Sequence, residues 1–277
     1  MPINRQRRSS NMNQNRSDQK LNIVCIIQAR MGSSRLPGKV MKDICGYPML
    51  DWVVYRAKQA SNISTVIVAT TIDDSDDPIA DWCAENRVAC FRGSVLDVLD
   101  RFYQAASSAQ ADIIVRLTAD CPLVDPMVMN DVIDLLLNES ADFAANRLPP
   151  PFHRTFPIGL DVEVVSFSAL ERAWREADQS FEREHVLPYL YEQEGRFKVS
   201  ILNAPQDLGD LRWTVDTQQD LDFIRAVLAD LECDRNLSWL SILNHIKNKP
   251  ELSQINAEIP HKSFMDVDHR TSNQEND

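Results

Sequence analysis

The amino-acid sequence predicts an α/β protein whose sheet is mostly parallel and flanked by helices. Four apolar, β-branched runs of strand length alternate with amphipathic helical segments up to about residue 140; the runs are 21–28, 64–71, 87–91 and 111–118. Continuous apolar runs are typical of strands covered on both faces, and their alternation with helices is typical of βαβ units. At 277 residues and 44% apolar content, the chain is large enough to bury a sizeable core.

Helical spacing and start signals place a helix after each of these runs. The helical stretches contain Leu50 to Ala57, Pro78, Val95 to Phe102, and Asp125 to Leu136. In the last of them, Asp125 is the expected N-cap and Pro126 the first helical residue. In the third, we expect Asp97 and Arg101 to form an exposed i,i+4 ion pair.

The second half of the chain is less regular. Its predicted elements are a strand at 160–165, helices at 167–177 and 180–194, strands at 196–202 and 211–215, and a helix from 217. Three prolines at 149–151 predict a rigid excursion, an arm of about residues 146–160 that packs on a partner subunit.

The charge distribution argues against nucleic-acid binding. The formal net charge is −12, and because residues 1–20 carry five basic residues and one acidic residue, the remainder carries −16. The basic, apolar-poor residues 1–20 predict a disordered tail, and residues 248–277 a polar C-terminal tail. A single domain is expected over 21–247.

The apolar runs and the cysteines predict a cytoplasmic protein without membrane contact. No run approaches the roughly 20 consecutive apolar residues that span a bilayer, and the N-terminal segment contains no apolar stretch suited to a signal sequence. The six cysteines form no C-x-x-C pair, and several lie inside apolar runs. That pattern favours buried, reduced thiols over disulfides or zinc ligands.

A glycine-rich, basic loop, IIQARMGSSRLPGKV at residues 26–40, follows the first predicted strand. Ligands of open parallel sheets bind at the carboxyl ends of the strands, so this loop lies where a ligand is expected. It is not a Walker A loop, because five residues separate Gly32 from Gly38 and no Ser or Thr follows Lys39. It is not a dinucleotide fingerprint either, because Ser34 stands where the second glycine is required.

The composition of this loop favours a triphosphate ligand. Glycines let the backbone approach closely, serines offer hydroxyls and amides, arginines bind phosphate oxygens through two bonds, and a lysine supplies a point charge. The candidate nucleotide-binding residues here are Ala29, Arg30, Gly32, Ser33, Ser34, Arg35 and Lys39. The alternative is a solvated basic loop with a turn at 36–38.

The loop resembles the signature A-R-x-x-S-x-R-L-P-G-K of the sugar cytidylyltransferases, which activate 3-deoxy-manno-octulosonate and the acylneuraminates. The resemblance is strongest to the spore-coat polysaccharide biosynthesis protein F branch and covers about residues 21–230. Its later blocks occur in order: ATTIDDSDDPI, FRGSVLDVLDRFY, VRLTADCPLVDP, GLDVEV, FEREHVLPYLY and LRWTVDT. The resemblance implies a Rossmann-like nucleotide-diphosphosugar transferase fold, a nucleotidyltransferase domain at 21–247 and a dimerisation arm.

The resemblance also implies roles at other strand ends. Asp120 would bind Mg²⁺ beside the α-phosphate with Asp216 as the second carboxylate, and Mg²⁺ prefers such oxygen ligands. Alternatively, Asp120 caps the turn before Pro122, and Asp216 lies at or near the N-cap of the helix from 217, where Thr217 and Asp220 match a capping box. The expected contacts to base and ribose are Arg92, Gly93 and Ser94.

The acceptor is expected over the second half of the chain. An acidic sugar would be recognised by arginine. The candidate substrate-binding residues are Asn146, Arg147, Arg154, Asp161, Arg183 and His185. For His185 two interpretations stay open, a role in orienting the sugar or accepting a proton, and a purely structural one.

Taken with these residues, the resemblance implies a Mg²⁺-dependent cytidylyltransferase. CMP would pass from CTP to a small acidic sugar, for surface polysaccharide or glycan synthesis, and pyrophosphate would leave. Lys39, Arg35 and Asp120 are the expected catalytic residues, and a homodimer is the expected assembly. One alternative is a nucleotide-sugar-dependent glycosyltransferase that uses the aspartates of 73–77 as its metal motif. The other is a catalytically inactive nucleotide-sugar-binding subunit.

Overall fold

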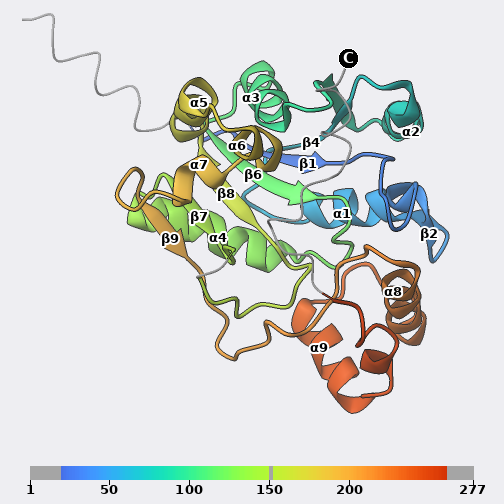
Figure 1. Ribbon diagram of the computed structural model, residues 1–277. Helices are drawn as coiled ribbons and strands as arrows, with labels where there is room; N and C mark the ends of the chain where they lie inside the picture. The colour runs from blue at the N-terminus through green and yellow to red at the C-terminus, as the bar shows by residue number, and fades with distance from the viewer. Residues whose placement is uncertain (1–19, 150–151, 261–277) are drawn as a thin grey trace, which may run out of the picture.

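The computed structural model describes residues 20–149 and 152–260 and confirms a mostly parallel α/β sheet (Figure 1). The seven strands lie in the order β5-β4-β1-β6-β8-β7-β9. Four are parallel to one another: β1 (Ile23–Gln28), β4 (Thr65–Thr71), β5 (Ala89–Gly93) and β6 (Ile113–Thr118). β8 (Glu163–Ser166) is antiparallel to β6 and to β7 (Phe143–Ala145), and β9 (Val199–Ile201) is parallel to β7.

Helices cover both faces of the sheet, as the continuous apolar strands require. The described helices are α1 (Met49–Lys58), α2 (Asp77–Glu85), α3 (Val98–Ser108), α4 (Pro126–Glu139), α5 (Phe167–Glu176), α6 (Ser180–His185), α7 (Pro188–Tyr191), α8 (Gln218–Asp230) and α9 (Trp239–Asn248). One apolar core lies between the sheet and α1 and α4 and continues to α8, and the other lies between the sheet and α3 and α5 (Figure 1). None of these helices is long and apolar enough to cross a membrane.

The start of α4 confirms the predicted capping and ties two distant segments together. The Asp125 side chain accepts a hydrogen bond from the Met127 N–H at 2.8 Å, and Pro126 is the first helical residue. Its second oxygen accepts the Trp239 N–H at the start of α9, also at 2.8 Å. A buried carboxylate therefore satisfies orphan donors of two helices at once.

Two predictions for the second half are wrong in detail. The segment 211–215 is not a strand, because its only sheet-like pairing among the described residues is an isolated bridge from Arg212 to Ile158. The helix expected at 180–194 is broken at Val186, whose φ of 75° lies outside the helical region, and Pro188 starts α7. Strand β7 and helix α9 were not predicted.

The expected i,i+4 pair of α3 is also wrong. Asp97 is the N-cap of α3, accepting the Asp100 N–H at 2.9 Å, and it pairs with Arg183 at 2.6 Å. Arg101 faces inward and is only 1% exposed. Helix position alone did not show that the arginine lies on the buried face.

Part of the predicted arm packs on its own chain. Residues 150–151 lie outside the described residues, but Phe156 and Leu160 are buried. Gly159 has a φ of 104°, and a Cβ there would lie 2.5 Å from the Thr214 backbone nitrogen, so only glycine fits. Packing on a partner subunit stays a prediction.

The C-terminal packing extends past residue 248. Leu252, in the short helix η3 (Leu252–Gln254), is buried, and so is Asn256. The Asn256 side chain donates to the Arg212 carbonyl at 3.1 Å and to the Asp220 carboxylate at 3.0 Å. The two predicted tails otherwise fall on 1–19 and 261–277, outside the described residues.

The prediction that all cysteines are reduced is wrong for one pair. Cys45 and Cys233 form a disulfide across a sequence separation of 188, whereas Cys25, Cys83, Cys90 and Cys121 are free. Cys45 lies in the turn between β2 (Asp43–Ile44) and β3 (Tyr47–Pro48), and Cys233 follows α8. Sequence spacing gave no sign of this pairing because the two residues meet only through the tertiary fold.

We expect Cys233→Ser to destabilise the fold by about 2–5 kcal/mol under oxidising conditions, because the disulfide closes a very long loop in the unfolded chain. Urea unfolding with and without reductant measures this, and the variant should show no further effect of reductant. Thiol titration of the denatured, unreduced protein should count four free thiols, matching the free cysteines. A count of six would contradict the disulfide.

Candidate active site

A cavity of about 250 Å³ opens at the carboxyl ends of β1 and β6. Its lining consists of Gln28, Arg30, Gly32, Ser33, Ser34, Arg35, Lys39, Val40, Thr118, Ala119, Asp120 and Asp216. The structure therefore brings the basic loop together with both predicted metal ligands. The cavity includes the loops after residues 28 and 118, but not those after 71 and 91.

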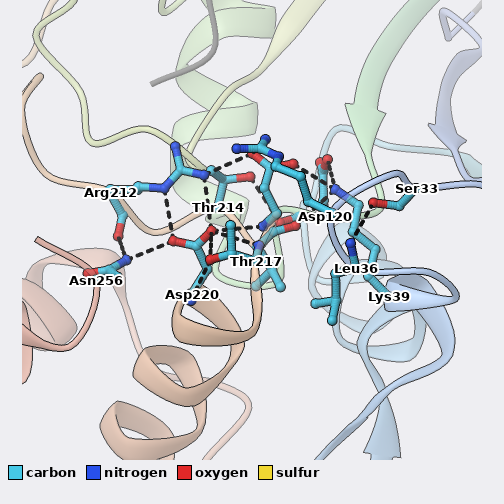
Figure 2. A network of polar contacts seen from close by, with 12 residues as sticks. Ser33, Leu36, Lys39, Asp120, Arg212, Thr214, Thr217, Asp220 and Asn256 are labelled. Atoms are coloured by element: carbon cyan, nitrogen blue, oxygen red, sulfur yellow. Dashed lines mark hydrogen bonds and ion pairs between the residues drawn. The ribbon is translucent and has the colours of Figure 1, made fainter. Parts of the chain in front are cut away.

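Backbone hydrogen bonds close the basic loop into a compact unit. The Gly38 N–H donates to the Met31 carbonyl at 2.9 Å, and Gly38 has a φ of 66°, a conformation that favours glycine. Inside the loop, the Ser33 hydroxyl accepts the Leu36 N–H at 3.3 Å (Figure 2). The short helix η1 (Lys39–Met41) starts directly after Gly38, so the glycine turn sets the direction of the Lys39 side chain.

The Lys39 ammonium bridges Asp120 and Asp216, and Figure 2 shows the Lys39 side chain beside Asp120. Its Nζ lies 2.8 Å from Asp120 Oδ2 and 2.9 Å from Asp216 Oδ1, and it donates to the Val215 carbonyl at 2.9 Å. The Val215 N–H in turn donates to the Asp120 carbonyl at 2.9 Å. Three segments far apart in sequence thus meet at one buried lysine.

The charges of this group stabilise one another. Burial favours the neutral carboxyls, but the ammonium of Lys39 holds the pKa of Asp120 and of Asp216 below the ordinary range. Burial likewise disfavours the lysine charge, yet the two aspartates raise its pKa above its ordinary value. All three groups are therefore ionised at neutral pH.

Two arginines complete the surroundings of Asp216. Its Oδ2 lies 2.9 Å from Arg35 and 2.9 Å from Arg212, and Arg212 also pairs with the buried Asp220 at 2.8 Å. The N-cap of α8 is Thr217, whose side chain forms a capping box with Asp220. Asp216 is therefore not the cap, and its carboxylate faces the cavity.

The donor set at the cavity fits Mg²⁺. The described residues include no cluster of three or more His, Cys, Asp or Glu side chains suited to a metal ion. Mg²⁺ does not need one, because it takes one or two carboxylates and completes its shell with substrate phosphates and water. The carboxylates of Asp120 and Asp216 both reach the Lys39 ammonium, so they lie close enough together to share one Mg²⁺ ion.

The base-binding candidates lie outside the cavity lining. The Arg92 guanidinium is held by the turn after β4, donating to the Thr71 carbonyl at 2.8 Å and pairing with Asp77 at 2.6 Å. A Cβ on Gly93 would lie 3.1 Å from the Arg101 side chain, so the backbone here packs closely on α3. Contacts of Arg92, Gly93 and Ser94 to a nucleobase stay a prediction.

The acceptor candidates divide into two groups. Asp161 lies between Arg147 and Arg154, 3.3 Å from the Nε of Arg147 and 3.1 Å from one Nη of Arg154. The buried Asn146 side chain donates to the Leu160 carbonyl at 2.7 Å and accepts the Val162 N–H at 2.9 Å, which is a structural role.

Arg183 and His185, on α6, have different surroundings. Arg183 pairs with Asp97 and donates to the Trp174 carbonyl at 2.7 Å, which fixes α6 against α3 and α5. The pKa of His185 is lowered by burial and by the nearby charges of Arg116, Arg147 and Arg30, only partly offset by Glu184. Its imidazole is therefore neutral at pH 7 and lies in a basic neighbourhood.

Sequence reasoning missed several residues of the site. Gln28 and Thr118 line the cavity as the last residues of β1 and β6. Arg116 donates to the Gln28 side chain at 3.1 Å and to the Glu163 carboxylate. The sequence did contain a signal for these residues. Gln28, Arg116 and Thr118 are polar positions in otherwise apolar strands, and a buried polar side chain requires a partner.

The fold is that of the Rossmann-like nucleotidyltransferases. It matches the solved structure of a cytidylyltransferase from Leptospira borgpetersenii with a TM-score of 0.78 and 32% identity, covering 87% of this chain and 99% of that one. Residues 24–260 match the family model for cytidylyltransferases. The chain therefore belongs to the cytidylyltransferase family.

Two relatives of the chain are similar to it over different lengths. The spore coat polysaccharide biosynthesis protein SpsF of Bacillus subtilis is 32% identical over 212 residues, 74% of this chain and 85% of that protein. A 3-deoxy-manno-octulosonate cytidylyltransferase of Saccharophagus degradans is 37% identical over 131 residues, 47% of this chain and 51% of that protein.

We expect Lys39→Met to reverse the pH dependence of stability at this site. In the wild type, the lowered pKa of Asp120 contributes stability above the unfolded value of about 4, which is lost as pH falls through the folded pKa. Without the ammonium, burial raises that pKa above its ordinary value, so the variant should lose stability as pH rises through it.

Urea unfolding between pH 4 and 8 measures the effect. Lys42→Met, a substitution three residues away, is the control, because no ion pair to the Lys42 side chain occurs among the described residues. Equal pH slopes for Lys39→Met and the wild type would contradict the assigned electrostatics.

Proposed function

We propose that the protein transfers CMP from CTP to a small acidic sugar and releases pyrophosphate. The observation that carries the proposal is the buried Lys39, held between Asp120 and Asp216 at the end of a closed, basic glycine loop. Membership of the cytidylyltransferase family supports it. The names of the Bacillus subtilis and Saccharophagus degradans relatives support a role in surface polysaccharide or glycan synthesis.

The reaction is a displacement at the α-phosphorus. A sugar hydroxyl oxygen bonds to phosphorus, the bond from phosphorus to the bridging oxygen breaks, and pyrophosphate leaves with that electron pair. The loop amides and Arg30 bind the triphosphate, while Arg35 and Lys39 stabilise the charge that develops on the leaving group. This is catalysis by positioning and electrostatics, without a covalent intermediate on the protein.

Asp120 and Asp216 are the residues that would hold Mg²⁺ in this proposal. When bound, the ion neutralises phosphate charge and makes the α-phosphorus more electrophilic. The carboxylates are ionised at neutral pH, which a Mg²⁺ ligand requires. Arg212, by pairing with Asp216, fixes the orientation of one of them.

The basic neighbourhood of His185 supports an acidic acceptor. Arg30, Arg116 and Arg147 lie near enough to lower the pKa of this histidine. Arg116 and Arg147 are paired with Glu163 and Asp161, so an acceptor carboxylate would share these arginines with them. The neutral imidazole of His185 is able to accept the hydroxyl proton or to orient the sugar.

The glycosyltransferase alternative has less support. Asp74 and Asp76 have the D-x-D spacing, but the carboxylate of Asp76 is buried and accepts backbone and hydroxyl donors. Asp73 caps the helix η2 (Asp74–Asp76), and Asp77 pairs with Arg92. The carboxylates of Asp73, Asp76 and Asp77 therefore serve the local fold. An inactive subunit is distinguished from an enzyme by the turnover measurement that follows.

Pyrophosphate release is the direct test of the reaction. We expect release in the presence of Mg²⁺ with CTP and at least one member of a panel of nonulosonic acids, and little with ATP, GTP or UTP. Omitting the sugar or adding EDTA should abolish release. Turnover with a nucleotide sugar as donor and no pyrophosphate would favour the glycosyltransferase instead.

Asp120→Asn tests the metal role with little change of shape. Loss of one carboxylate charge should lower kcat by about two orders of magnitude or more, comparable to the removal of other electrostatic groups in active sites. Asp81→Asn, on the exposed side of α2, removes the same charge elsewhere and should leave turnover unchanged. An Asp120→Asn enzyme with wild-type kcat would refute the role.

A further inference from the structure

Asp76 is a buried carboxylate with four donors, and it lies outside the cavity lining. It is 2% exposed and ends the short helix η2 after β4. Its Oδ1 accepts the Met31 N–H at 2.6 Å. Its Oδ2 accepts the Thr70 hydroxyl at 3.0 Å, the Thr71 N–H at 3.2 Å and the Thr71 hydroxyl at 2.5 Å.

The donor arrangement requires a carboxylate rather than an amide. The N–H groups of Met31 and Thr71 are backbone donors that cannot become acceptors, and each faces a different oxygen of Asp76. An asparagine has one oxygen, so in either orientation its NH₂ would face one of these N–H groups. The threonine hydroxyls can rotate to adapt, but the two backbone donors cannot.

The charge of Asp76 is balanced without a direct pair. Arg101, 1% exposed, has a guanidinium whose Nε and Nη1 have no hydrogen-bond partner within the described part of the chain. Burial lowers the pKa of Arg101 to about 10, and the charge of Asp76 opposes this lowering. Since no hydrogen bond from Arg101 to Asp76 occurs in the described structure, the carboxylate oxygens serve the four neutral donors.

Met31 lies at the base of the glycine-rich loop, where the loop closes on itself. Its carbonyl accepts the Gly38 N–H that closes the loop, while its own N–H donates to Asp76. The loop between Met31 and Gly38 carries Arg35, and Lys39 follows Gly38 directly. Asp76 thus fixes the point where the whole loop attaches to the sheet.

The Asp76 carboxylate is also connected to residues 92–94, the segment expected to contact base and ribose. Thr71, which donates twice to Asp76, accepts the Arg92 Nε–H through its carbonyl at 2.8 Å. The loop after β1 is therefore bonded to the buried Asp76 carboxylate directly, and the segment at the end of β5 is connected to it through Thr71.

We propose that Asp76 is a positioning residue for nucleotide binding. By accepting the Met31 N–H, it holds the base of the loop against the end of β4 and so sets the orientation of the loop that binds the triphosphate. The proposal rests on the proposed function, since it assigns a nucleotide to that loop. Asp76 lies outside the cavity lining and acts through the segments that it holds, chiefly the loop.

The test compares three variants that separate positioning from stability. Asp76→Asn removes one of the two acceptors for the backbone donors. Asp74→Asn makes the same charge change in the same turn on an exposed side chain. Thr70→Val removes one donor to the same carboxylate but leaves the Met31 bond in place, so it serves as the control for a general loss of packing.

Two readouts are measured on the full-length protein. The first is hydrogen exchange of the Met31 amide without nucleotide, which we expect to be at least about tenfold faster in Asp76→Asn and unchanged in Asp74→Asn. The second is calorimetric binding of CTP with Mg²⁺, which should weaken about tenfold or more in Asp76→Asn. KM for CTP should rise accordingly, with kcat at saturating CTP changed much less.

The outcomes distinguish the proposals. Wild-type exchange at Met31 in Asp76→Asn, or an equal loss of CTP affinity in Thr70→Val, would overturn the positioning role. If Asp76→Asn proves too unstable to purify, Thr71→Val should still speed Met31 exchange more than Thr70→Val does, because it removes the shorter hydroxyl bond to Asp76 and also the acceptor of the Asp73 N–H, whereas Thr70→Val removes only the 3.0 Å bond. Failure of the wild type to bind CTP would count against the proposed function alone, because the exchange comparison needs no nucleotide.

Discussion

The ammonium of Lys39 between Asp120 and Asp216 is the interaction on which the site depends. A buried cation needs opposite charges close by, and buried carboxylates need the cation equally, so neither is stable without the other. The glycine loop, the end of β6 and the segment before α8 are each brought to the lysine by this mutual requirement. The sheet supplies the edge at which they meet.

The charge network does not stop at the cavity. The second carboxylate oxygen of Asp216 pairs with Arg212, and Arg212 also pairs with Asp220. Asp220 in turn accepts a hydrogen bond from the side-chain amide of Asn256. Every member is hydrogen-bonded, which is the condition for a buried polar network to rigidify a fold instead of weakening it. Residues near 256 therefore belong to the domain, since they complete the support of a cavity residue.

The sequence was informative where local chemistry decides the structure. Asp125 followed by Pro126 has one good interpretation, and the capping box at Thr217 is equally local. The short strand β7 and the pairing of Cys45 with Cys233 depend on contacts between distant segments, which no spacing shows. Arg101 lies between these cases, because helical periodicity placed it but could not tell a buried arginine from an exposed one.

The reversed direction of β8 has a consequence for how specificity is distributed. Because β8 is antiparallel to β6, its first residue, Glu163, pairs with Arg116 near the carboxyl end of β6. The chain that enters β8, with Asp161 and the arginines around it, is thereby delivered to the same edge as the nucleotide loop. The residues proposed to bind the acceptor therefore lie on a return segment, separate from the parallel strands that carry the loop proposed to bind CTP. A change in the return segment can alter acceptor contacts without altering the register of β1, β4 and β6.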